Sequence, residues 1–502
     1  MGKFNKQMTA KQAVRAKKGA TVNYEGGLAY TVSNKVQLVK QIATSLIGEN
    51  KFYTSGGRTD SEIISLIHSV MKEDPEFVLK LAVYTREELK LRSAPIVLLG
   101  EYANTIGSKG VKNSRKYITR TIQRVDEITE LIGYQLNRNL KSPRHSKLPM
   151  SIKHGVAQAF NKFSEFQFAK YNRKGNVKLK DALFMTHPKP KDTEQQRIFD
   201  EIANDELPTP ETWETYISEN GSTKETWSHI APKMSIFALV RNLRNLLEND
   251  VPTDLYINKL RDRQTILHSK MLPFRFYSAY KAVSEDVPNQ FFAKRDVMDA
   301  LEDAMQLSIS NIKKIPGKTL VLIDVSGSMG WPISQKSSVT YSDISTLFGA
   351  MADEICDQAV VGVFASQFKI VNLSRKAPIL TKQSELKRIN VGGATYAHLG
   401  VQWAIDNHVD LDRILIFSDM QAYSSYWGGS VAEDLEIYRR QINHDTYLHS
   451  FDLSGYNTAL TAEDDPKSNL VAGWSEKIFD YIHYFEKGFG SMVTDVEKVN
   501  IE

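Results

Sequence analysis

The chain has 502 residues, 41% hydrophobic and 25% charged, which is ordinary for a globular protein and long enough for about three domain-sized units. Its longest uncharged apolar runs, such as Pro95–Gly100, fall far short of the ~18–20 residues that cross a bilayer, and its basic N-terminus lacks the apolar stretch of a secretory signal. The single cysteine, Cys356, excludes an intramolecular disulfide framework and a multi-cysteine zinc site, so we expect a cytoplasmic protein without membrane contact.

The net charge of +5 hides an asymmetry along the chain. Residues 1–316 carry 49 lysines and arginines against 35 acidic residues, whereas residues 317–502 carry 15 against 24. Within the basic part, residues 109–191 hold 19 basic and only 5 acidic residues. This asymmetry predicts two modules, and the basic one favours a polyanionic partner, with nucleic acid as the first candidate. From charge alone, a basic face without a ligand is the alternative.

Amphipathic helices are predicted in series before residue 318, where strand-like alternation is scarce. Asp74 followed by Pro75 has the pattern of an N-cap and a first helical residue, and Ser222 with Glu225 has the spacing of a capping box. Helices joined by brief breaks predict an α-solenoid of stacked helix pairs, although no repeat of fixed period is visible. An irregular helical bundle is the alternative.

The segment 111–132 is predicted as one helix with two distinct faces. The buried stripe is expected at Ile118, Ile122, Val125 and Ile132. Lys116, Arg120 and Arg124 lie four residues apart on another face. Such a row of cations repels itself, so we expect an anion nearby and count the three residues as candidate RNA contacts. Alternatively, their long stems only cover apolar surface.

From residue 318 the pattern changes to alternating strands and helices. We expect strands within 318–326, 359–366 and 412–421, and helices within 340–356, 384–389 and 396–408. This alternation predicts an α/β domain with a doubly wound parallel sheet. In such sheets, ligands bind beyond the carboxyl ends of the strands.

Three polar loops fall at or near those strand ends. Asp324, Ser326 and Ser328 directly follow a strand, Thr395 lies in a glycine-rich loop, and Asp419 lies at the tip of a later strand. All five carry hard oxygen donors, and two carboxylates with hydroxyl groups suit Mg²⁺ better than a soft metal. The sequence therefore predicts a divalent-cation site, with Mg²⁺ as the expected ion.

These three loops, in this order, resemble the metal-ion-dependent adhesion site of the von Willebrand factor A domain. The resemblance implies an open coordination position that takes a carboxylate from a partner. The same loop argues against two enzyme classes. A dehalogenase-type phosphotransferase needs a carboxylate where Ser326 stands, and a serine hydrolase needs a G-x-S-x-G motif that residues 326–330 lack. We therefore expect no catalytic residues and no enzyme.

Four segments of the chain carry a further resemblance: 92–95, 169–190, 233–247 and 270–283. Together with the α/β domain, they resemble the TROVE-domain Ro 60 kDa autoantigen family in its bacterial or phage form. The resemblance implies HEAT-like helical repeats closed into a ring over residues 20–316 and a von Willebrand factor A domain over residues 317–502. It also implies a monomer that binds Y RNA on its basic outer surface and single-stranded 3′ ends of misfolded RNAs in its hole. A 3′ exoribonuclease such as polynucleotide phosphorylase is an implied partner.

By the same resemblance, the segment that contacts Y RNA matches Lys170, Arg173 or Lys174, and His187. Arg173 and Lys174 compete for one role. Cations and an imidazole suit A-form RNA, which proteins recognise through its shape, phosphates and 2′-hydroxyl groups. A loop-capping role is the alternative for His187. The rival for the whole chain is a protein-interaction scaffold whose metal site binds an acidic partner; a metal-chelatase-type subunit fits the four segments less well.

Overall fold

The computed structural model describes residues 20–22, 28–30, 33–44, 59–105, 110–140, 148–173, 175–288, 293–333, 338–419, 430–453, 465–472 and 477–501. Lys174, one of the predicted RNA contacts, lies outside these residues. Among the helices within these ranges, none is long and apolar enough to span a bilayer.

The chain divides into two compact units. The first comprises most of the chain up to Leu207 together with the C-terminal residues from Lys487, and the second runs from Pro208 to Glu486. The expected domain boundary between residues 316 and 317 falls within the second unit, inside the first strand of its sheet, β3 (Ile315–Asp324), and stays a prediction.

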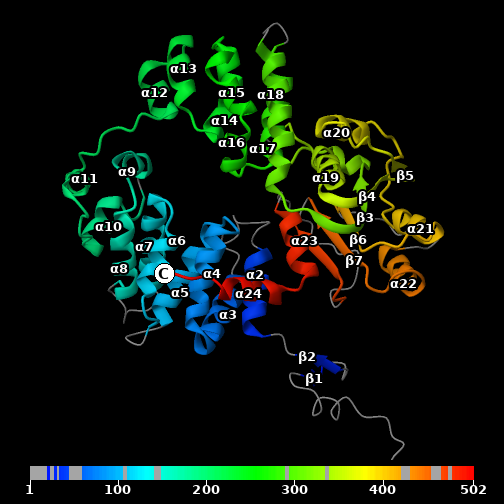
Figure 1. Cartoon of the computed structure of the whole chain (residues 1–502), viewed down its shortest axis with the longest axis horizontal. Coiled ribbons are helices and arrows are strands. Elements are labelled where there is room, and N and C mark those ends of the chain that lie inside the picture. The colour runs from blue at the N-terminus through cyan, green and yellow to red at the C-terminus, as the bar shows by residue number, and fades with distance from the viewer. Residues whose placement is uncertain are drawn as a thin grey trace, which may run out of the picture. The chain divides into compact units, whose positions relative to one another are not determined.

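The first unit is built from helices that pack on near neighbours in the chain (Figure 1). They are α2 (Asn34–Thr44), α3 (Thr59–Glu73), α4 (Pro75–Glu87), α5 (Ser93–Thr105), α6 (Ser114–Thr121), α7 (Val125–Leu140), α8 (Met150–Phe160), α9 (Glu165–Tyr171), α10 (Leu179–Thr186), α11 (Thr193–Asn204) and α24 (Phe489–Glu497). The helix α24 packs on α2 and α4, and an antiparallel pair, β1 (Ala20–Val22) and β2 (Leu28–Tyr30), precedes α2. The predicted series of stacked helices is confirmed for this unit.

The helix starts show which sequence signals are reliable. Asp74 is the N-cap of α4, as predicted: its side chain accepts a hydrogen bond from the Phe77 amide at 3.1 Å. The prediction for Ser222 is wrong by one residue, because Thr223 caps α13 (Lys224–Ile230) and accepts from the amide of Thr226 at 3.3 Å. The Ser222 hydroxyl instead accepts from the indole of Trp227 at 2.8 Å, the partner that a buried indole N–H requires.

The predicted single helix over 111–132 is also wrong, because α6 ends at Thr121 and α7 begins at Val125. The break is stabilised by Glu127, whose carboxylate accepts hydrogen bonds from the amides of Gln123 at 2.8 Å and Arg124 at 3.1 Å. These bonds satisfy amides that the start of α7 leaves without a helical partner. The predicted apolar stripe is nevertheless buried. Arg124 lies between the two helices, outside the helix α6 that carries Lys116 and Arg120.

The second unit begins with helices and continues into the sheet domain. Its first helices are α12 (Trp213–Asn220), α13 (Lys224–Ile230), α14 (Ile236–Glu248), α15 (Ile257–Arg261), α16 (Arg263–Ser269), α17 (Pro273–Asp286) and α18 (Ala293–Ser308). The strands of the sheet are β3 (Ile315–Asp324), β4 (Cys356–Phe364), β5 (Phe368–Val371), β6 (Arg413–Ser418), β7 (Tyr447–Asp452) and β8 (Ser468–Ala472).

The sheet has the order β5-β4-β3-β6-β7-β8, and its neighbouring strands are parallel except for β4 and β5. The chain passes from β3 to β4 on one side and later returns to β6 on the other side of β3. The strand order therefore reverses between β3 and β6, the position at which open α/β sheets bind ligands. The predicted doubly wound domain is confirmed, and the sheet also contains three strands that the sequence did not reveal, the antiparallel edge strand β5 and the parallel strands β7 and β8.

Helices cover both faces of the sheet, as two glycines demonstrate. A Cβ atom at Gly349 of α19 (Tyr341–Ile355) would lie 2.1 Å from Ile323, and one at Gly400 of α21 (His398–Asp406) would lie 2.4 Å from Leu322. Consecutive strand residues point to opposite faces, so α19 and α21 lie on opposite faces of β3. The remaining helices of this domain are α20 (Ile379–Lys387), α22 (Val431–Gln441) and α23 (Ile478–Glu486).

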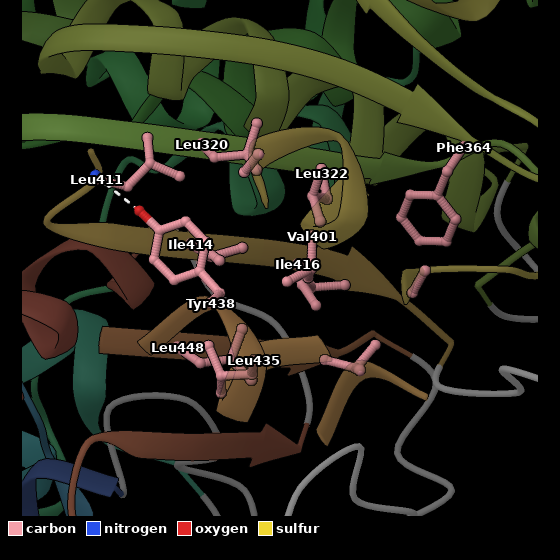
Figure 2. Packing of buried hydrophobic residues seen from close by; sticks show 13 residues of the cluster. Leu320, Leu322, Phe364, Val401, Leu411, Ile414, Ile416, Leu435, Tyr438 and Leu448 are labelled. Carbon is pink, nitrogen blue, oxygen red and sulfur yellow. Dashed lines mark hydrogen bonds between the residues drawn. The ribbon is translucent and has the colours of Figure 1, made fainter. Parts of the chain in front are cut away.

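The core on the α21 and α22 face is apolar (Figure 2). It contains Leu320, Leu322, Phe364, Val401, Leu411, Ile414, Ile416, Leu435, Tyr438 and Leu448. The Tyr438 hydroxyl is satisfied within this core, because it accepts from the Leu411 amide at 2.9 Å and donates to the Val409 carbonyl at 2.7 Å. Burial of each large aliphatic side chain here contributes roughly 1.5–3 kcal/mol to the stability of the fold. This packing holds in place the strands that carry the polar loops.

Candidate metal centre and nucleic-acid interface

Asp324 lies at the carboxyl end of β3, beside the end of β6. Ile323 pairs with Phe417, so the next residues, Asp324 and Ser418, also lie side by side. The Ser418 hydroxyl donates to one oxygen of the Asp324 carboxylate, and the Ser326 amide donates to the other at 2.8 Å. The carboxylate is thus fixed in a fully buried position at the reversal of strand order.

The electrostatics at this edge favour a cation. The pKa of Asp324 is raised to about 6, chiefly by burial and in smaller part by the charge of Asp419, while the hydrogen bonds from Ser418 and Ser326 act in the opposite direction. Asp419 is itself buried and directly follows β6. Two buried carboxylates this close disfavour simultaneous ionisation unless a cation or a proton compensates.

The glycine-rich loop brings Thr395 to the same edge. The Ser366 hydroxyl, just beyond β4, accepts from the amides of Gly393 at 3.1 Å and Ala394 at 3.0 Å, and the Gly327 amide donates to the Gly393 carbonyl at 3.3 Å. Gly392 has a φ of 97°, and a Cβ atom there would lie 2.6 Å from the Ser366 side chain, so only glycine fits. The loop is therefore tied to the ends of both β4 and β3, with Thr395 buried within it.

The structure thus brings the five predicted donors to one edge of the sheet. The hydroxyl oxygens of Ser326 and Ser328 lie 3.2 Å apart, and Ser326 is buried. Within the described ranges, no group of three or more His, Cys, Asp or Glu side chains is placed to hold a metal, so hydroxyl groups would have to complete the ligand set. Two carboxylates and three hydroxyls fit a hard divalent cation such as Mg²⁺.

Two neighbours of this set, Ser366 and Ser418, were not identified from the sequence. Each occurs at or just after the last residue of a parallel strand, and that placement is the signal that could have identified them. Trp331 was missed as well. It follows the Ser328 loop by three residues, its amide donates to the Ser328 carbonyl at 3.4 Å, and 71% of its surface is exposed.

In the first unit, several predicted RNA contacts converge on one tyrosine. The ring centroid of Tyr171 lies 4.6 Å from Cζ of Arg124, 5.9 Å from Nζ of Lys170 and 6.0 Å from Cζ of Arg173. Lys170 also lies 5.9 Å from the ring centroid of Phe166. We call these five residues the α9 patch. The sequence predicted its cations but neither of its aromatic residues, which occur one turn before Lys170 and directly after it.

His187 lies at the C-terminal end of α10. Its backbone is left-handed, with φ 48° and ψ 60°, and its amide donates to the Leu183 carbonyl at 2.9 Å. The capping interpretation therefore holds for the backbone, while the imidazole is exposed. The loop that follows is tied to the end of α8, because the side-chain amide of Asn161 donates to the Lys189 carbonyl at 2.8 Å.

Two of the three cations in the predicted row 116, 120 and 124 have partners within the chain that charge counting did not reveal. The Arg120 guanidinium donates two hydrogen bonds to Glu87, at 2.8 and 2.6 Å, and Arg124 donates two to Asp126, at 3.1 and 2.8 Å. The anions expected near these two arginines are therefore carboxylates of this chain. Lys116 is exposed, forms no ion pair with a described residue, and lines a cavity of about 300 Å³ beside Arg120.

Comparison with protein families gives two matches. The TROVE domain family matches residues 4–206 and 205–297, and the Ro60 vWA domain family matches residues 318–486. Among solved structures, the crystal structure of the Deinococcus radiodurans RO (RSR) protein aligns with a TM-score of 0.68 at 14% identity. The alignment covers 91% of this chain and all of that chain, which establishes a shared fold.

Curated relatives are distant in sequence. The RNA-binding protein RO60 of Deinococcus radiodurans is 20% identical over 460 residues, covering 82% of this chain and 85% of the relative. The RNA-binding protein RO60 of Caenorhabditis elegans is 22% identical over 277 residues, covering 51% of this chain and 40% of the relative. Telomerase protein component 1 of Mus musculus is 20% identical over 338 residues, covering half of this chain but only 13% of that relative's length.

Proposed function

Because the chain belongs to the TROVE domain family and carries a Ro60-type vWA domain, we propose that it is a non-catalytic RNA-binding protein of the Ro type. In this proposal, structured Y RNA binds the basic first unit, and single-stranded 3′ ends of misfolded RNAs enter a ring formed by the helical repeats. RNA bound in this way is delivered to a 3′ exoribonuclease such as polynucleotide phosphorylase. The protein acts as a cytoplasmic monomer.

The α9 patch is the observation that carries this proposal. Three cations from two separate segments meet around Tyr171, and Lys170 and Arg173 are exposed. Phosphate neutralisation by such cations supplies most of the affinity in RNA binding, whatever the sequence. The further RNA contacts proposed in this unit are His187, whose imidazole is exposed, and Lys116. Arg173 and Lys174 are alternatives for one RNA contact, and we assign it to Arg173.

The first experiment is to purify the full chain at low salt and to recover any RNA that remains bound. We expect an absorbance ratio at 260 and 280 nm well above that of protein alone, a fall in this ratio after a high-salt wash, and release of a small structured RNA. Purified protein that carries no RNA and also fails to bind added structured or 3′-tailed RNA at low salt would contradict the proposal.

For the sheet edge, we propose that Asp324, Ser326, Ser328, Thr395 and Asp419 hold a divalent cation, with Mg²⁺ as the expected ion. The support is the convergence of two buried carboxylates and three hydroxyl groups, five hard oxygen donors in all, at one edge of the sheet. When bound, the ion supplies a positive centre with room for an external oxygen ligand. The protein's own part is to hold the donors rigidly, through the contacts of Ser366, Ser418 and Gly327.

A second candidate function is that of a scaffold that binds an acidic protein partner through this site. Trp331 favours it, since a large aromatic side chain exposed beside a ligand site is typical of residues that dominate binding energy at interfaces. Replacing Trp331 with alanine should then weaken capture of an acidic partner in Mg²⁺ and leave RNA affinity unchanged. Unaltered partner binding in this variant would reject the role of Trp331.

A further inference from the structure

Phe166 is an exposed aromatic residue of α9, with 47% of its surface accessible to solvent. The helix is anchored by a different ring, Phe168, which is fully buried and stacks on Phe160 with ring centroids 5.7 Å apart. Because Phe168 provides the buried contact, the core does not require an aromatic side chain at position 166. A single exposed apolar residue is common in soluble proteins, so exposure alone indicates no ligand.

The surroundings of Phe166 make it unusual. Lys170 lies one helical turn further on and places its ammonium group 5.9 Å from the centroids of both Phe166 and Tyr171. Arg173 follows at 6.0 Å from Tyr171. Lys170 and Arg173 are exposed, and neither forms an ion pair with a residue that the structure describes. An exposed ring beside Lys170, with Arg173 beside the neighbouring Tyr171, is complementary to a nucleotide, whose base is aromatic and whose phosphates are negative.

Tyr171 is less available for stacking than Phe166. The guanidinium of Arg124 lies over its ring at 4.6 Å and is held there by two hydrogen bonds to Asp126. These contacts cover one face of the tyrosine from within the protein. Phe166 is therefore the ring of the α9 patch that is left for a base.

The short helix that carries Phe166 is fixed at both its start and its side. Ser164 and Gln167 form a capping box, with the Ser164 amide donating to the Gln167 side chain at 3.0 Å. Glu165 pairs with Arg197 of α11 at 3.1 Å. A ring on a helix held in this way needs little ordering when a ligand binds, which favours affinity.

We infer that Phe166 is a stacking site for one unpaired nucleobase of a bound RNA, with Lys170 and Arg173 contacting the phosphates beside that base. The inference rests on the proposed RNA-binding function and names the kind of nucleotide that the α9 patch selects. The bases of an A-form duplex are stacked on one another and cannot reach the ring, whereas an unpaired base next to a duplex can. Stacking on an aromatic face tolerates every base, so the site selects unpaired nucleotides and not a particular sequence.

The test compares two RNA probes on the full chain. One is a blunt RNA hairpin, and the other is the same hairpin with a short unpaired 5′ extension that carries 2-aminopurine, a base whose fluorescence falls on stacking. We expect the wild-type protein to bind the extended hairpin about tenfold more tightly than the blunt one, and to quench the 2-aminopurine.

Variants of Phe166 separate stacking from simple apolar contact. Phe166→Leu keeps apolar bulk but removes the aromatic face, so it should bind both hairpins with the affinity that the wild type has for the blunt one, and quenching should be lost. Phe166→Tyr should keep the preference and the quenching. Met150→Ala is the matched control, since Met150 is an apolar residue of the same unit with 59% exposure, and it should behave as the wild type.

The outcomes distinguish this inference from the proposed function. Equal wild-type affinities for the two hairpins, or a preference that persists in Phe166→Leu, would overturn the stacking site while RNA binding stands. Failure of both hairpins to bind at low salt would overturn both proposals and assign the α9 patch to a protein partner. Thermal unfolding of each variant verifies that the fold is retained, and the wild-type quenching tests the inference even without variants.

Discussion

The carboxyl edge of the sheet and the α9 patch hold their candidate residues in opposite ways. At the sheet edge, Asp324 and Asp419 are buried, and hydrogen bonds between loops fix the donors around them. At the α9 patch, Lys170 and Arg173 are exposed, and their charged groups lie 5.9 and 6.0 Å from the Tyr171 ring centroid, near the distance limit of cation–π interactions. A small ion needs a rigid cage of short contacts, whereas a large polyanion needs accessible charges on a firm surface.

This difference explains why the sequence predicts the grouping of residues at the sheet edge better than the availability of cations on the helices. Parallel strands bring their carboxyl ends together whatever the details, so residues placed there meet by topology. Helix surfaces follow no such rule, and whether a cation is available depends on neighbours from other helices. Arg120, bound to Glu87, and Lys116, with no described ion pair, lie one turn apart on α6 and illustrate this.

The largest effect is expected from Asp324→Ala at the sheet edge. This variant should abolish Mg²⁺ binding measured by isothermal titration calorimetry. The reason is the loss of a carboxylate that accepts hydrogen bonds from both the Ser326 amide and the Ser418 hydroxyl. RNA affinity should be nearly unchanged, because the proposed RNA contacts lie in the other unit. Asp445→Ala, which removes an exposed carboxylate of the sheet domain, is the control. A large RNA defect in a folded Asp324→Ala protein would show that the two sites are coupled.

Within the basic unit, the next largest effect is expected from Glu127→Ala, at about 3–5 kcal/mol of lost unfolding free energy. Glu127 is buried, pairs with Arg86 at 2.9 Å and caps the start of α7, so its loss leaves a buried guanidinium uncompensated. Chemical denaturation measures this cost. Glu130→Ala removes an exposed carboxylate of the same helix and should cost about 1 kcal/mol or less. Equal costs for the two variants would contradict the assignment.

A third prediction concerns pH and Asp343 at the start of α19. Burial raises the pKa of this carboxyl, but hydrogen bonds from Lys281, Lys387 and the Thr340 amide outweigh burial and lower the pKa to about 2. A folded-state pKa below the ordinary value of 3.8 stabilises the fold above pH 4, and this stabilisation is lost as the pH falls toward 2.

Asp343→Asn should therefore lower the unfolding free energy by about 2 kcal/mol near neutral pH, with the difference from wild type shrinking below pH 4. Denaturant titrations at several pH values measure this difference. A constant difference across the whole range would mean that Asp343 acts through shape and not through charge.

The proposed RNA contacts are tested by the double variant His187→Ala with Lys170→Ala, which should weaken binding of structured RNA about tenfold and leave the fold intact. Removal of the lysine should also flatten the salt dependence of log K by roughly 0.7–0.9. Filter binding over a salt series measures both quantities. Lys224→Ala, which removes a lysine of the second unit paired with Asp250, is the control. Unchanged RNA affinity in the double variant would contradict the assignment of these two residues to the RNA interface.

The smallest effect separates two cations of α6. Arg120→Ala should leave RNA affinity within about twofold, because Glu87 already occupies its guanidinium, whereas Lys116→Ala should flatten the salt dependence by roughly 0.7–0.9. Measuring the RNA affinity of both variants over the same salt series tests these two expectations. The reverse order of effects would mean that RNA displaces Glu87 from Arg120.

Local sequence patterns were enough to predict the fold class of both regions. Periodic apolar positions such as Ile118 and Val125 specify helix faces, and the short β-branched run before Asp324 specifies a buried parallel strand. Because strand ends converge, the motif around Asp324, the loop of Thr395 and the tip at Asp419 were sufficient to predict one metal site.

The polar side chains that surround the candidate metal ligands, and the cations that are left exposed, became clear from contacts between distant parts of the chain. Ser366 and Ser418 act through strands that are neighbours only in the sheet, and Glu87 reaches Arg120 from another helix. The break before Val125 likewise depends on Glu127, which a simple periodic pattern conceals. Short-range patterns specify helices and strands because backbone geometry is local, whereas the pairing of charges depends on contacts between residues that are distant in the chain.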